Sequence, residues 1–433
     1  MLVTDQKVPL ILIDASHGNV NAGGREMRMF TQDLSDHGYN VLKNLSPLTT
    51  TVLNTETVKL LLITAPQTAY TDSELNAIAD YAANGGSLWL CGLADYTSKG
   101  ANPWAASVAD RMNAILVRIE TRTGAPINMR LNDDEVIDGN TNNGYVFGVL
   151  WGDFPGSSAT GIGVNVESLA SWSLSSIRGQ LVTQPITSGT PGVQIVVQGD
   201  LEDGYTPDYH HNPYHTSNED ADEEGDAYIY NPTWVYPNPK PANPLPLPMA
   251  AVTQLPNGGG RLLLYGDSND AFTTFAYTAG DGKQNELFNL ETVMWLLGTP
   301  VTRTTIAEAR AYTTVNQPDK LDQLVWVEGK ITAAYGEFFN VLYVEDETGG
   351  ITIHAPAGDI SATQYARGAQ VRVLGSIDIY QGDTEIQFFE AEQVQVLTPT
   401  NHIDPAPLPL STQAASLEAN QGWLTQITGT VTV

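Results

Sequence analysis

Apolar strand-like segments alternate with amphipathic helix-like segments in the N-terminal part of the chain, and this alternation limits the folds available to it. Residues 8–14 (VPLILID), 60–64 (LLLIT) and 87–93 (SLWLCGL) are nearly continuous apolar runs. Residues 24–38 and 71–86 instead carry apolar residues on one helical face and end at glycine. Strands that are apolar throughout are buried on both faces, as in a parallel sheet covered by helices. We therefore predict an α/β domain with a doubly wound, mostly parallel sheet of the flavodoxin type.

The same pattern returns near residue 260 and closes this domain. Residues 258–272 (GGGRLLLYGDSNDAF) have the pattern of a strand that ends in acidic residues, and residues 285–298 (NELFNLETVMWLLG) that of a helix. We place the domain at residues 1–299, with a long insertion at residues 201–250. Loops of that length are usually functional or disordered. Within the domain, the Thr71-to-Glu74 spacing predicts a capping box at the start of a helix.

A second domain is predicted at residues 319–398, where the sequence changes to short alternating β segments. Turns rich in glycine and aspartate separate these segments, and no helical pattern lies between them. This arrangement predicts a small all-β barrel of the OB type. Residues 300–318 are expected to be a linker before the barrel. Residues 399–420 are expected to be a proline-rich linker after it.

Residues 421–433 are predicted to form the first strand of a second OB-type module. LTQITGTVT at 424–432 aligns with LVWVEGKIT at 324–332, with Gly429 and Gly329 at the same position. A single strand cannot close a barrel, and its unpaired backbone groups form a sticky edge. Two alternatives follow: the chain is cut from a longer protein with tandem modules, or this strand completes a sheet in a neighbouring subunit to give a homo-oligomer or polymer.

The charge balance points to an extracellular or cell-surface protein. Twenty basic and 49 acidic residues give a net charge of −29, yet only 16% of residues are charged, against about 25% in an average protein. The acidity therefore reflects missing lysines, and the resulting field repels nucleic-acid phosphates. The apolar runs are much shorter than the roughly 20 residues that cross a bilayer. The first residues lack a signal-peptide pattern, so an export signal is expected to be removed or to lie outside this chain.

Several motifs resemble two known families. LIDASHGN, the 63–92 segment ITAPQTAYTDSELNAIADYAANGGSLWLCG, RLNDDEVID and GGRLLLYGDSNDAF resemble the class I glutamine amidotransferase-like superfamily. The resemblance is to its branch of uncharacterised extracellular bacterial proteins and gliding-motility-type proteins. WVEGKITA, YVEDETGGITIHAP and VRVLGSI resemble the OB-fold domains of secreted bacterial nucleases. These resemblances imply a secreted, multidomain surface protein.

The nucleophile of catalytic amidotransferases is not recognised in this chain. Such enzymes place a cysteine on a tight G-x-C-x-G turn, and the single cysteine, Cys91, lies in LWLCGLA. Trp89 and Leu93 replace the two glycines, so their Cβ atoms would crowd that turn. A His-x-Glu pair to activate the thiol is not recognised either. We therefore expect a buried structural cysteine, no catalytic residues and no organic cofactor.

Polar residues at the strand ends form a candidate metal site. Ligands bind at the carboxyl ends of the strands in doubly wound sheets. Asp14 and His17 end the first strand, and Asp267 and Asp270 follow the last one. If these strands are neighbours, the side chains suit Ca²⁺, Mg²⁺ or another divalent cation. The alternative is that Asp caps a following helix and His17 binds a backbone carbonyl.

The insertion holds a second group of candidate metal ligands. The stretch DYHHNPYHTSNEDADEEGD combines histidines and carboxylates, which makes Ca²⁺ a candidate cofactor. Its spacing is not that of a calcium loop, and Pro213 argues against a helical pair of histidines. A solvated acidic loop is the alternative. The candidate ligands are His210, His211, His215, Asp220, Asp222 and Asp226.

The barrel has aromatic side chains but little positive charge, so protein or glycan partners are favoured over nucleic acid. Its aromatic candidates are Trp326, Phe338, Phe339, Tyr343 and Tyr380, and its basic ones Lys330, Arg367 and Arg372. Our first hypothesis is a non-enzymatic extracellular or cell-surface protein that acts in assembly, adhesion or polysaccharide or protein contact. The alternative is a secreted metal-dependent hydrolase or nuclease accessory protein.

Overall fold

A computed structural model of the 433-residue chain contains two compact units, Met1–Pro300 and Val301–Val433. The structure describes residues 10–37, 39–93, 107–132, 135–137, 148–150, 154–164, 166, 169–171, 174–181, 184–198, 209–211, 248–268, 272, 284–298, 303–313, 317–321, 323–337, 341–354, 365–387, 394–397, 406–411 and 423–427.

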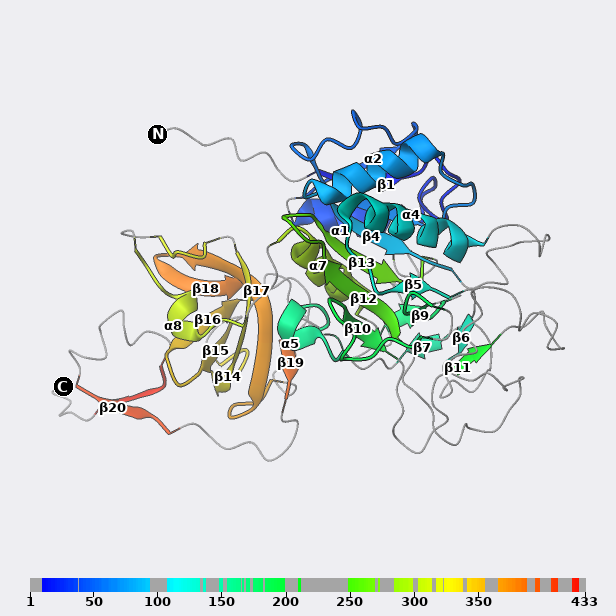
Figure 1. The fold of residues 1–433 in the computed structure, drawn as a ribbon. Helices are drawn as coiled ribbons and strands as arrows, with labels where there is room; N and C mark the ends of the chain where they lie inside the picture. Colours follow the sequence, from blue (N-terminus) through cyan, green and yellow to red (C-terminus); the bar gives the residue numbers. More distant parts are fainter. Residues whose placement is uncertain are drawn as a thin grey trace. The chain divides into compact units, whose positions relative to one another are not determined.

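The first unit is a mixed α/β unit built on a seven-stranded sheet (Figure 1). The strand order is β10-β12-β13-β4-β3-β1-β2. The five strands from β13 to β2 are parallel to one another. At the β13 edge, β12 pairs antiparallel with β13, and β10 pairs antiparallel with β12. The strands are β1 (Leu10–Asp14), β2 (Asn40–Asn44), β3 (Val58–Thr64), β4 (Ser87–Cys91), β10 (Gln194–Gln198), β12 (Pro248–Gln254) and β13 (Arg261–Tyr265).

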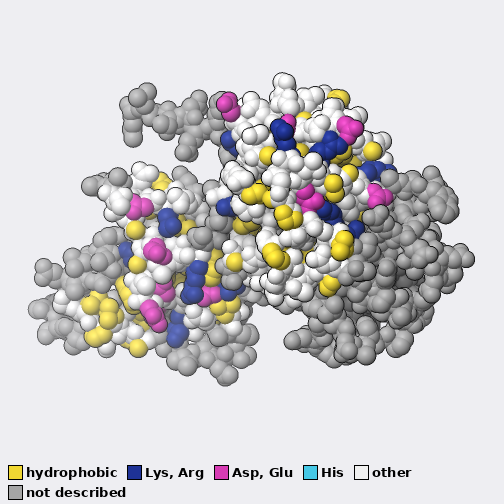
Figure 2. Space-filling model, viewed as in Figure 1, with side chains coloured by type: hydrophobic (Ala, Val, Ile, Leu, Met, Phe, Trp, Pro, Cys, Tyr) yellow, Lys and Arg dark blue, Asp and Glu magenta, His cyan; other side chains and the backbone are white. Residues whose placement is uncertain are grey.

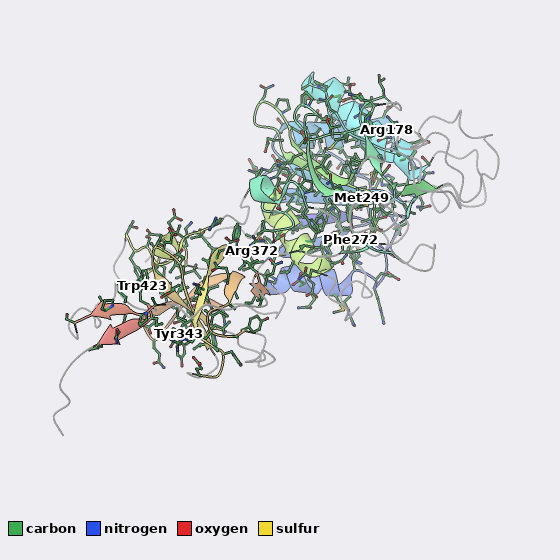
Figure 3. The ribbon with its side chains drawn as sticks, turned by 90° about the horizontal axis from the view of Figure 1, so that it is seen from below. Arg178, Met249, Phe272, Tyr343, Arg372 and Trp423 are labelled. Carbon is green, nitrogen blue, oxygen red and sulfur yellow. The ribbon has the colours of Figure 1, made fainter. Side chains whose placement is uncertain are left out.

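Helices cover both faces of the central strands, which explains why those strands are apolar throughout. The helices are α1 (Arg28–Asp36), α2 (Asp72–Ala83), α4 (Val108–Thr123) and α7 (Asn285–Leu296). On one face, α2 packs against α4, and alternate strand residues such as Leu61 and Leu90 share a core with them (Figure 1). On the other face, the Trp89 ring contacts Phe30 of α1 and Phe272, a residue labelled in Figure 3. Each central strand therefore buries the side chains of both its faces.

Side-chain caps fix the starts of α2 and α4. Thr71 accepts a hydrogen bond from the Glu74 backbone, and the Glu74 side chain accepts one from the Thr71 backbone, which confirms the predicted capping box. Ser107 and Asp110 form the same arrangement at α4, and Gly124 ends that helix in a left-handed conformation. The carboxylates also lie at the positive end of each helix dipole.

Smaller elements complete the first unit. β5 pairs with β9, β6 with β11 and β7 with β8, each as an antiparallel pair. Of the insertion at residues 201–250, the structure describes β11 and the start of β12. The smaller elements of the first unit are β5 (Arg130–Leu131), β6 (Glu135–Ile137), β7 (Gly148–Leu150), α5 (Ser157–Thr160), β8 (Leu169–Ser171), β9 (Ile177–Arg178) and β11 (Tyr209–His211).

The second unit contains a closed five-stranded β-barrel, as predicted. β14 pairs with both β15 and β17, so the ring closes in the order β14-β15-β16-β18-β17. β16 and β18 are the parallel pair, and this connectivity makes the barrel OB-like. β19 adds to β17 outside the ring. The strands are β14 (Leu324–Ala333), β15 (Val341–Glu345), β16 (Gly350–His354), β17 (Gln370–Tyr380), β18 (Asp383–Gln387) and β19 (Val394–Val396).

The segment expected to be a linker at residues 300–318 packs on the barrel. It contains the short helix α8 (Ile306–Ala309), whose two terminal residues are buried in the barrel core. The Ile306 backbone N–H donates to Asp346, which anchors the helix to the turn between β15 and β16. The barrel unit therefore begins before its first strand.

Near the end of the chain, β20 (Leu408–Leu410) and β21 (Thr425–Ile427) form a two-stranded parallel pair. β21 lies in the segment predicted to start a second module, and β20 lies in the predicted proline-rich linker. The backbone N–H of Leu424 donates to Glu345 of the barrel. Residues 428–433 lie outside the described part of the chain. None of the described helices is both long and apolar enough to cross a membrane.

Gly266, directly after β13, occupies a position with no room for a side chain. A Cβ atom there would lie 1.8 Å from the backbone oxygen of Ser175, so Gly266→Ala forces the two segments apart. We expect it to lower the free energy of unfolding of the first unit by about 2 kcal/mol or more, as measured by denaturant titration. Gly23→Ala is the matched control, because a Cβ there has no atom within 4 Å. Equal effects of the two substitutions would contradict this packing.

Candidate functional site

The carboxyl edge of the parallel strands is where the structure gathers buried polar side chains. Asp14 ends β1, Cys91 ends β4, and Asp267 lies two residues beyond β13. Both aspartates are fully buried. Because β4 and β3 lie between β13 and β1, the two strand ends are three strand spacings, or about 14 Å, apart. Asp14 and Asp267 therefore share an edge of the sheet but are not adjacent.

Asp14 is surrounded by hydrogen-bond donors from its own loop and from the loop before α2. Its Oδ2 accepts from the Tyr70 hydroxyl at 2.8 Å and faces His17 Nδ1 at 3.0 Å. Its Oδ1 accepts from the backbone N–H and the hydroxyl of Ser16 at 3.0 and 2.7 Å. Burial raises the pKa of a carboxyl group, but these hydrogen bonds outweigh burial and lower the pKa of Asp14. The group is therefore a carboxylate at neutral pH.

His17 lies between two carboxylates. Its Nδ1 is 3.0 Å from Asp14 Oδ2, and its Nε2 is 3.2 Å from Glu74 Oε1. The ring also packs on Tyr70, with centroids 4.0 Å apart. Burial lowers the pKa of His17, but Asp14 and Glu74 outweigh it and raise the pKa above its ordinary value. With both ring nitrogens facing carboxylate oxygens, the arrangement favours the doubly protonated imidazolium.

Glu74 has two roles, one in the helix cap and one against His17. Its Oε2 accepts from the backbone N–H and the hydroxyl of Thr71 at 2.9 and 2.7 Å. Its Oε1 faces His17 and accepts from the backbone N–H of Leu48 at 3.2 Å. Burial opposes the charged form, yet these contacts lower the pKa of Glu74. Glu74 therefore ties α2 to the loop after β1.

The four side chains of Asp14, His17, Tyr70 and Glu74 form what we call the His17 network. While His17 is protonated, it has no free lone pair to act as a general base or as a metal ligand. Among the residues that the structure describes, no group of three or more His, Cys, Asp or Glu side chains is placed to hold a metal ion. The His17 network therefore attaches the loop after β1 to the loop before α2 through ionic contacts.

Sequence reasoning found Asp14 and His17 but missed their partners. Glu74 was assigned only to the capping box, and Tyr70 was given no role. The available signal was position: both residues lie at the start of the helix that follows β3, next to β1 in the sheet. In a parallel sheet, such a loop lies beside the end of the neighbouring strand.

Cys91 is a fully buried thiol at the end of β4. Burial, together with the nearby Asp267 carboxylate, raises the pKa of the Cys91 thiol well above its usual range. A thiol in this state has almost no thiolate at neutral pH, and the thiolate is the nucleophile. Next to it, the Ser268 hydroxyl donates to the Gly92 carbonyl at 2.8 Å, and Asn21 Nδ2 donates to the Ser268 carbonyl at 3.2 Å. These bonds tie the loops after β1, β4 and β13 together.

The other candidate metal ligands lie outside what the structure describes in full. His210 and His211 are placed by their backbone in β11, which pairs with β6, and their side chains lie outside the described residues. Asp270, His215, Asp220, Asp222 and Asp226 lie outside the described residues altogether.

On the barrel, described basic side chains are engaged with an acidic one. Arg372 Nη2 and Arg303 Nη2 lie 2.7 and 3.2 Å from Glu328. Both guanidinium groups also lie over the Trp326 ring, at 4.9 and 5.7 Å from its centroid. Arg372 projects from β17 and Tyr343 from β15 (Figure 3). On the face shown in Figure 2, basic and acidic side chains of the described residues lie near one another among uncharged ones.

Comparison with known proteins shows remote structural likeness only. No family model matches the chain, and no curated protein matches it. The mmIFT52 N-terminal domain is similar at a TM-score of 0.42 and 13% identity, covering 66% of this chain and 97% of that domain. A ThuA-like protein from Bacteroides uniformis has a TM-score of 0.30 and 12% identity, covering 67% of this chain and 92% of that one. A replication protein A heterotrimer bound to ssDNA has a TM-score of 0.14 and 20% identity, covering 17% of this chain and 57% of that one.

The His17 network predicts a specific dependence of stability on pH. The raised pKa of His17 means that its contribution is complete below about pH 6.5 and is lost as the pH rises through the raised value. The lowered pKa values of Asp14 and Glu74 mean that their contributions are present above about pH 4.5 and are lost in stronger acid. The network therefore stabilises the first unit most between about pH 4.5 and 6.5.

We expect His17→Gln to lower the free energy of unfolding by about 3 kcal/mol near pH 5.5, because it removes the positive charge between two buried carboxylates. The difference from wild type should shrink above pH 7. Urea titrations across this pH range measure it. His37→Gln is the control, because the His37–Asp33 pair at 3.2 Å is only partly buried and such pairs contribute less than about 1 kcal/mol. A loss for His17→Gln that stays constant from pH 5 to 9 would contradict a charged His17.

Proposed function

We propose that this protein is a non-enzymatic extracellular or cell-surface protein that acts in assembly, adhesion or contact with protein or polysaccharide. In this proposal the first unit is a doubly wound, amidotransferase-like domain that has lost its catalytic machinery. The second unit is an OB-type contact module of the kind that accompanies secreted nucleases. The observation that carries the proposal is the state of His17, whose two ring nitrogens both face carboxylates.

The reactive side chains of the carboxyl edge support this proposal. A general base needs a free lone pair, and a nucleophilic cysteine needs an accessible thiolate. The two carboxylates raise the pKa of His17 and favour its imidazolium form, and burial raises the pKa of the Cys91 thiol. Both are therefore arranged for stability rather than for turnover.

The packing of the sheet supports the doubly wound assignment. α2 and α4 share one core with alternate residues of the central strands, and α1 packs against α7. The Trp89 and Tyr265 rings face the second pair, through contacts with Phe30 and Phe288. Helices on both faces of parallel strands are the arrangement of doubly wound folds.

Surface composition supports the extracellular setting. Only 16% of residues are charged, and lysine and arginine together number 20 against 49 acidic residues. A surface of uncharged polar residues, with few lysines, suits contact outside the cell better than binding to nucleic acid.

An activity screen tests the proposal directly. We expect the purified protein to release no product from glutamine, ester, peptide, glycan or nucleic-acid substrates, with or without added divalent cations. Cys91→Ala should fold and behave as wild type, and the native thiol should react with labelling reagents only after denaturation. Turnover that is abolished by a chelator would replace the proposal with the metal-dependent hydrolase alternative. Turnover abolished by Cys91→Ala would restore an amidotransferase-type mechanism.

Assembly through the C-terminal strand is a second testable part. Within the described residues, β21 pairs only with β20, and an edge strand of this kind can add a strand from another subunit. We expect light scattering to detect concentration-dependent oligomers of the full chain. Deleting residues 421–433 should yield monomers with the same circular dichroism spectrum. A full chain that stays monomeric at high concentration would remove assembly from the proposal.

A further inference from the structure

Strand β2 is an open edge of the seven-stranded sheet. It is last in the strand order, and β1 is its neighbour. The Asn44 carbonyl accepts from the Ala15 backbone N–H, so the backbone groups of Asn44 point towards β1. These groups alternate between the two sides of a strand, and those of Val41 and Lys43 therefore point away from β1. On that side, neither residue has a backbone hydrogen-bond partner in the part of the chain that the structure describes.

Strand β21 has an open edge of the same kind. The Leu408 N–H of β20 donates to the Leu424 carbonyl, so the backbone groups of Thr425 and Ile427 point away from β20. Among the described residues, these groups have no hydrogen-bond partner either. A ribbon of two strands is marginal by itself. The β20–β21 ribbon would therefore be stabilised by a third strand.

Both open edges carry exposed apolar side chains. Of the eight large hydrophobic side chains that are exposed in the described part of the chain, four belong to these two places. Leu42 and Leu45 lie in β2 and directly after it, and Leu408 and Ile427 lie in the ribbon. Exposed apolar side chains beside unpaired backbone groups mark an edge that another strand can cover.

We propose that the open edge of β2 accepts β21 of a second copy of this chain. The inference rests on the proposed assembly through the C-terminal strand and names the surface that receives this strand. In an antiparallel arrangement, Val41 pairs with Ile427 of the second copy and Lys43 with its Thr425, and each pair exchanges both backbone hydrogen bonds. Because the two edges differ, the contact is head-to-tail and repeats from one copy to the next.

The charge of the C-terminal strand favours it as the occupant of the β2 edge. The chain carries a net charge of −29, yet residues 424–433 (LTQITGTVTV) contain no charged side chain. This strand therefore approaches another copy with little electrostatic repulsion. It also places no like charge opposite Lys43, the charged residue of β2.

The other sheet edges that the structure describes are less suited to accept a strand. β10, at the opposite edge of the seven-stranded sheet, is buried along its middle residues. The segment before α5 packs on β10, since a Cβ atom at Gly156 would lie 2.5 Å from the Ile195 carbonyl oxygen. The barrel ring is closed by the pairing of β14 with β17, and a closed ring has no edge.

A mixture of two full-length variants tests the proposal. Leu42→Lys alters the β2 edge, and Ile427→Lys alters the β21 edge; a lysine on an edge strand opposes pairing. We expect each variant alone to be monomeric by light scattering at concentrations where the wild-type chain forms oligomers. An equal mixture of the two variants should form dimers, because each keeps the edge that the other has lost. Growth should stop at the dimer.

Control variants separate the effect of the edge from that of an added charge. Leu42→Lys should raise the Kd of assembly at least about tenfold, equivalent to about 1.4 kcal/mol. Val117→Lys should leave it unchanged, because Val117 is 48% exposed, close to the 51% of Leu42, but lies on α4. Val41→Pro removes an N–H that points away from β1 and should act as Leu42→Lys does. Circular dichroism and thermal melting establish that each variant folds, and Leu42→Lys tests the edge even if Val41→Pro is misfolded.

Three results would overturn the proposal. They are assembly of Leu42→Lys as in the wild type, a mixture of the two variants that stays monomeric, and a wild-type chain that is itself monomeric. If deleting residues 421–433 gives monomers while Leu42→Lys still assembles, the C-terminal strand drives assembly but β2 is not its acceptor. Failure of the proposed assembly and failure of this acceptor edge are therefore distinguishable.

Discussion

The ionic contact of His17 with Asp14 and Glu74 organises the functional edge of the first unit. Asp14 belongs to β1, and Glu74 to the first turn of α2. Between them, an imidazolium ring that packs on Tyr70 fixes the loop after β1 against the loop before α2. The free-energy cost of burying these charges is offset because each carboxylate also receives other hydrogen bonds. The edge where α/β proteins commonly hold a ligand is thus occupied by a structural charge network.

The two units differ in the pKa shifts of their buried carboxylates. In the first unit, the buried Asp14 and Glu74 carboxylates have hydrogen-bond donors, and their pKa values are lowered. On the barrel, Glu385 is also buried, and burial raises its pKa. Hydrogen-bond donors therefore favour the charged form of the carboxylates in the first unit, whereas burial favours the neutral form of Glu385.

The sequence predicts local structure better than it predicts contacts between segments. Apolar runs located β1, β3 and β4, spacing located the capping box at Thr71, and short alternating segments located the closed barrel. The place of β13 beside β4 and the approach of Glu74 to His17 were not predicted, because both depend on how distant segments pack. α8 was missed because its buried residues, Ile306 and Ala309, form too short a pattern to recognise without the barrel they cover.

Closure of the barrel by β14 and β17 has a consequence for how the second unit forms. β14 is the first barrel strand in the chain, and Leu324 pairs with Ser376 far along the sequence. During synthesis, the β14–β15–β16 segment therefore exists for a time with two open edges. Pairing between such distant segments is slow, because the long loop between them loses conformational entropy before the stabilising contacts form. The barrel should thus form in one cooperative step, after the ribosome has released the β17–β18 hairpin.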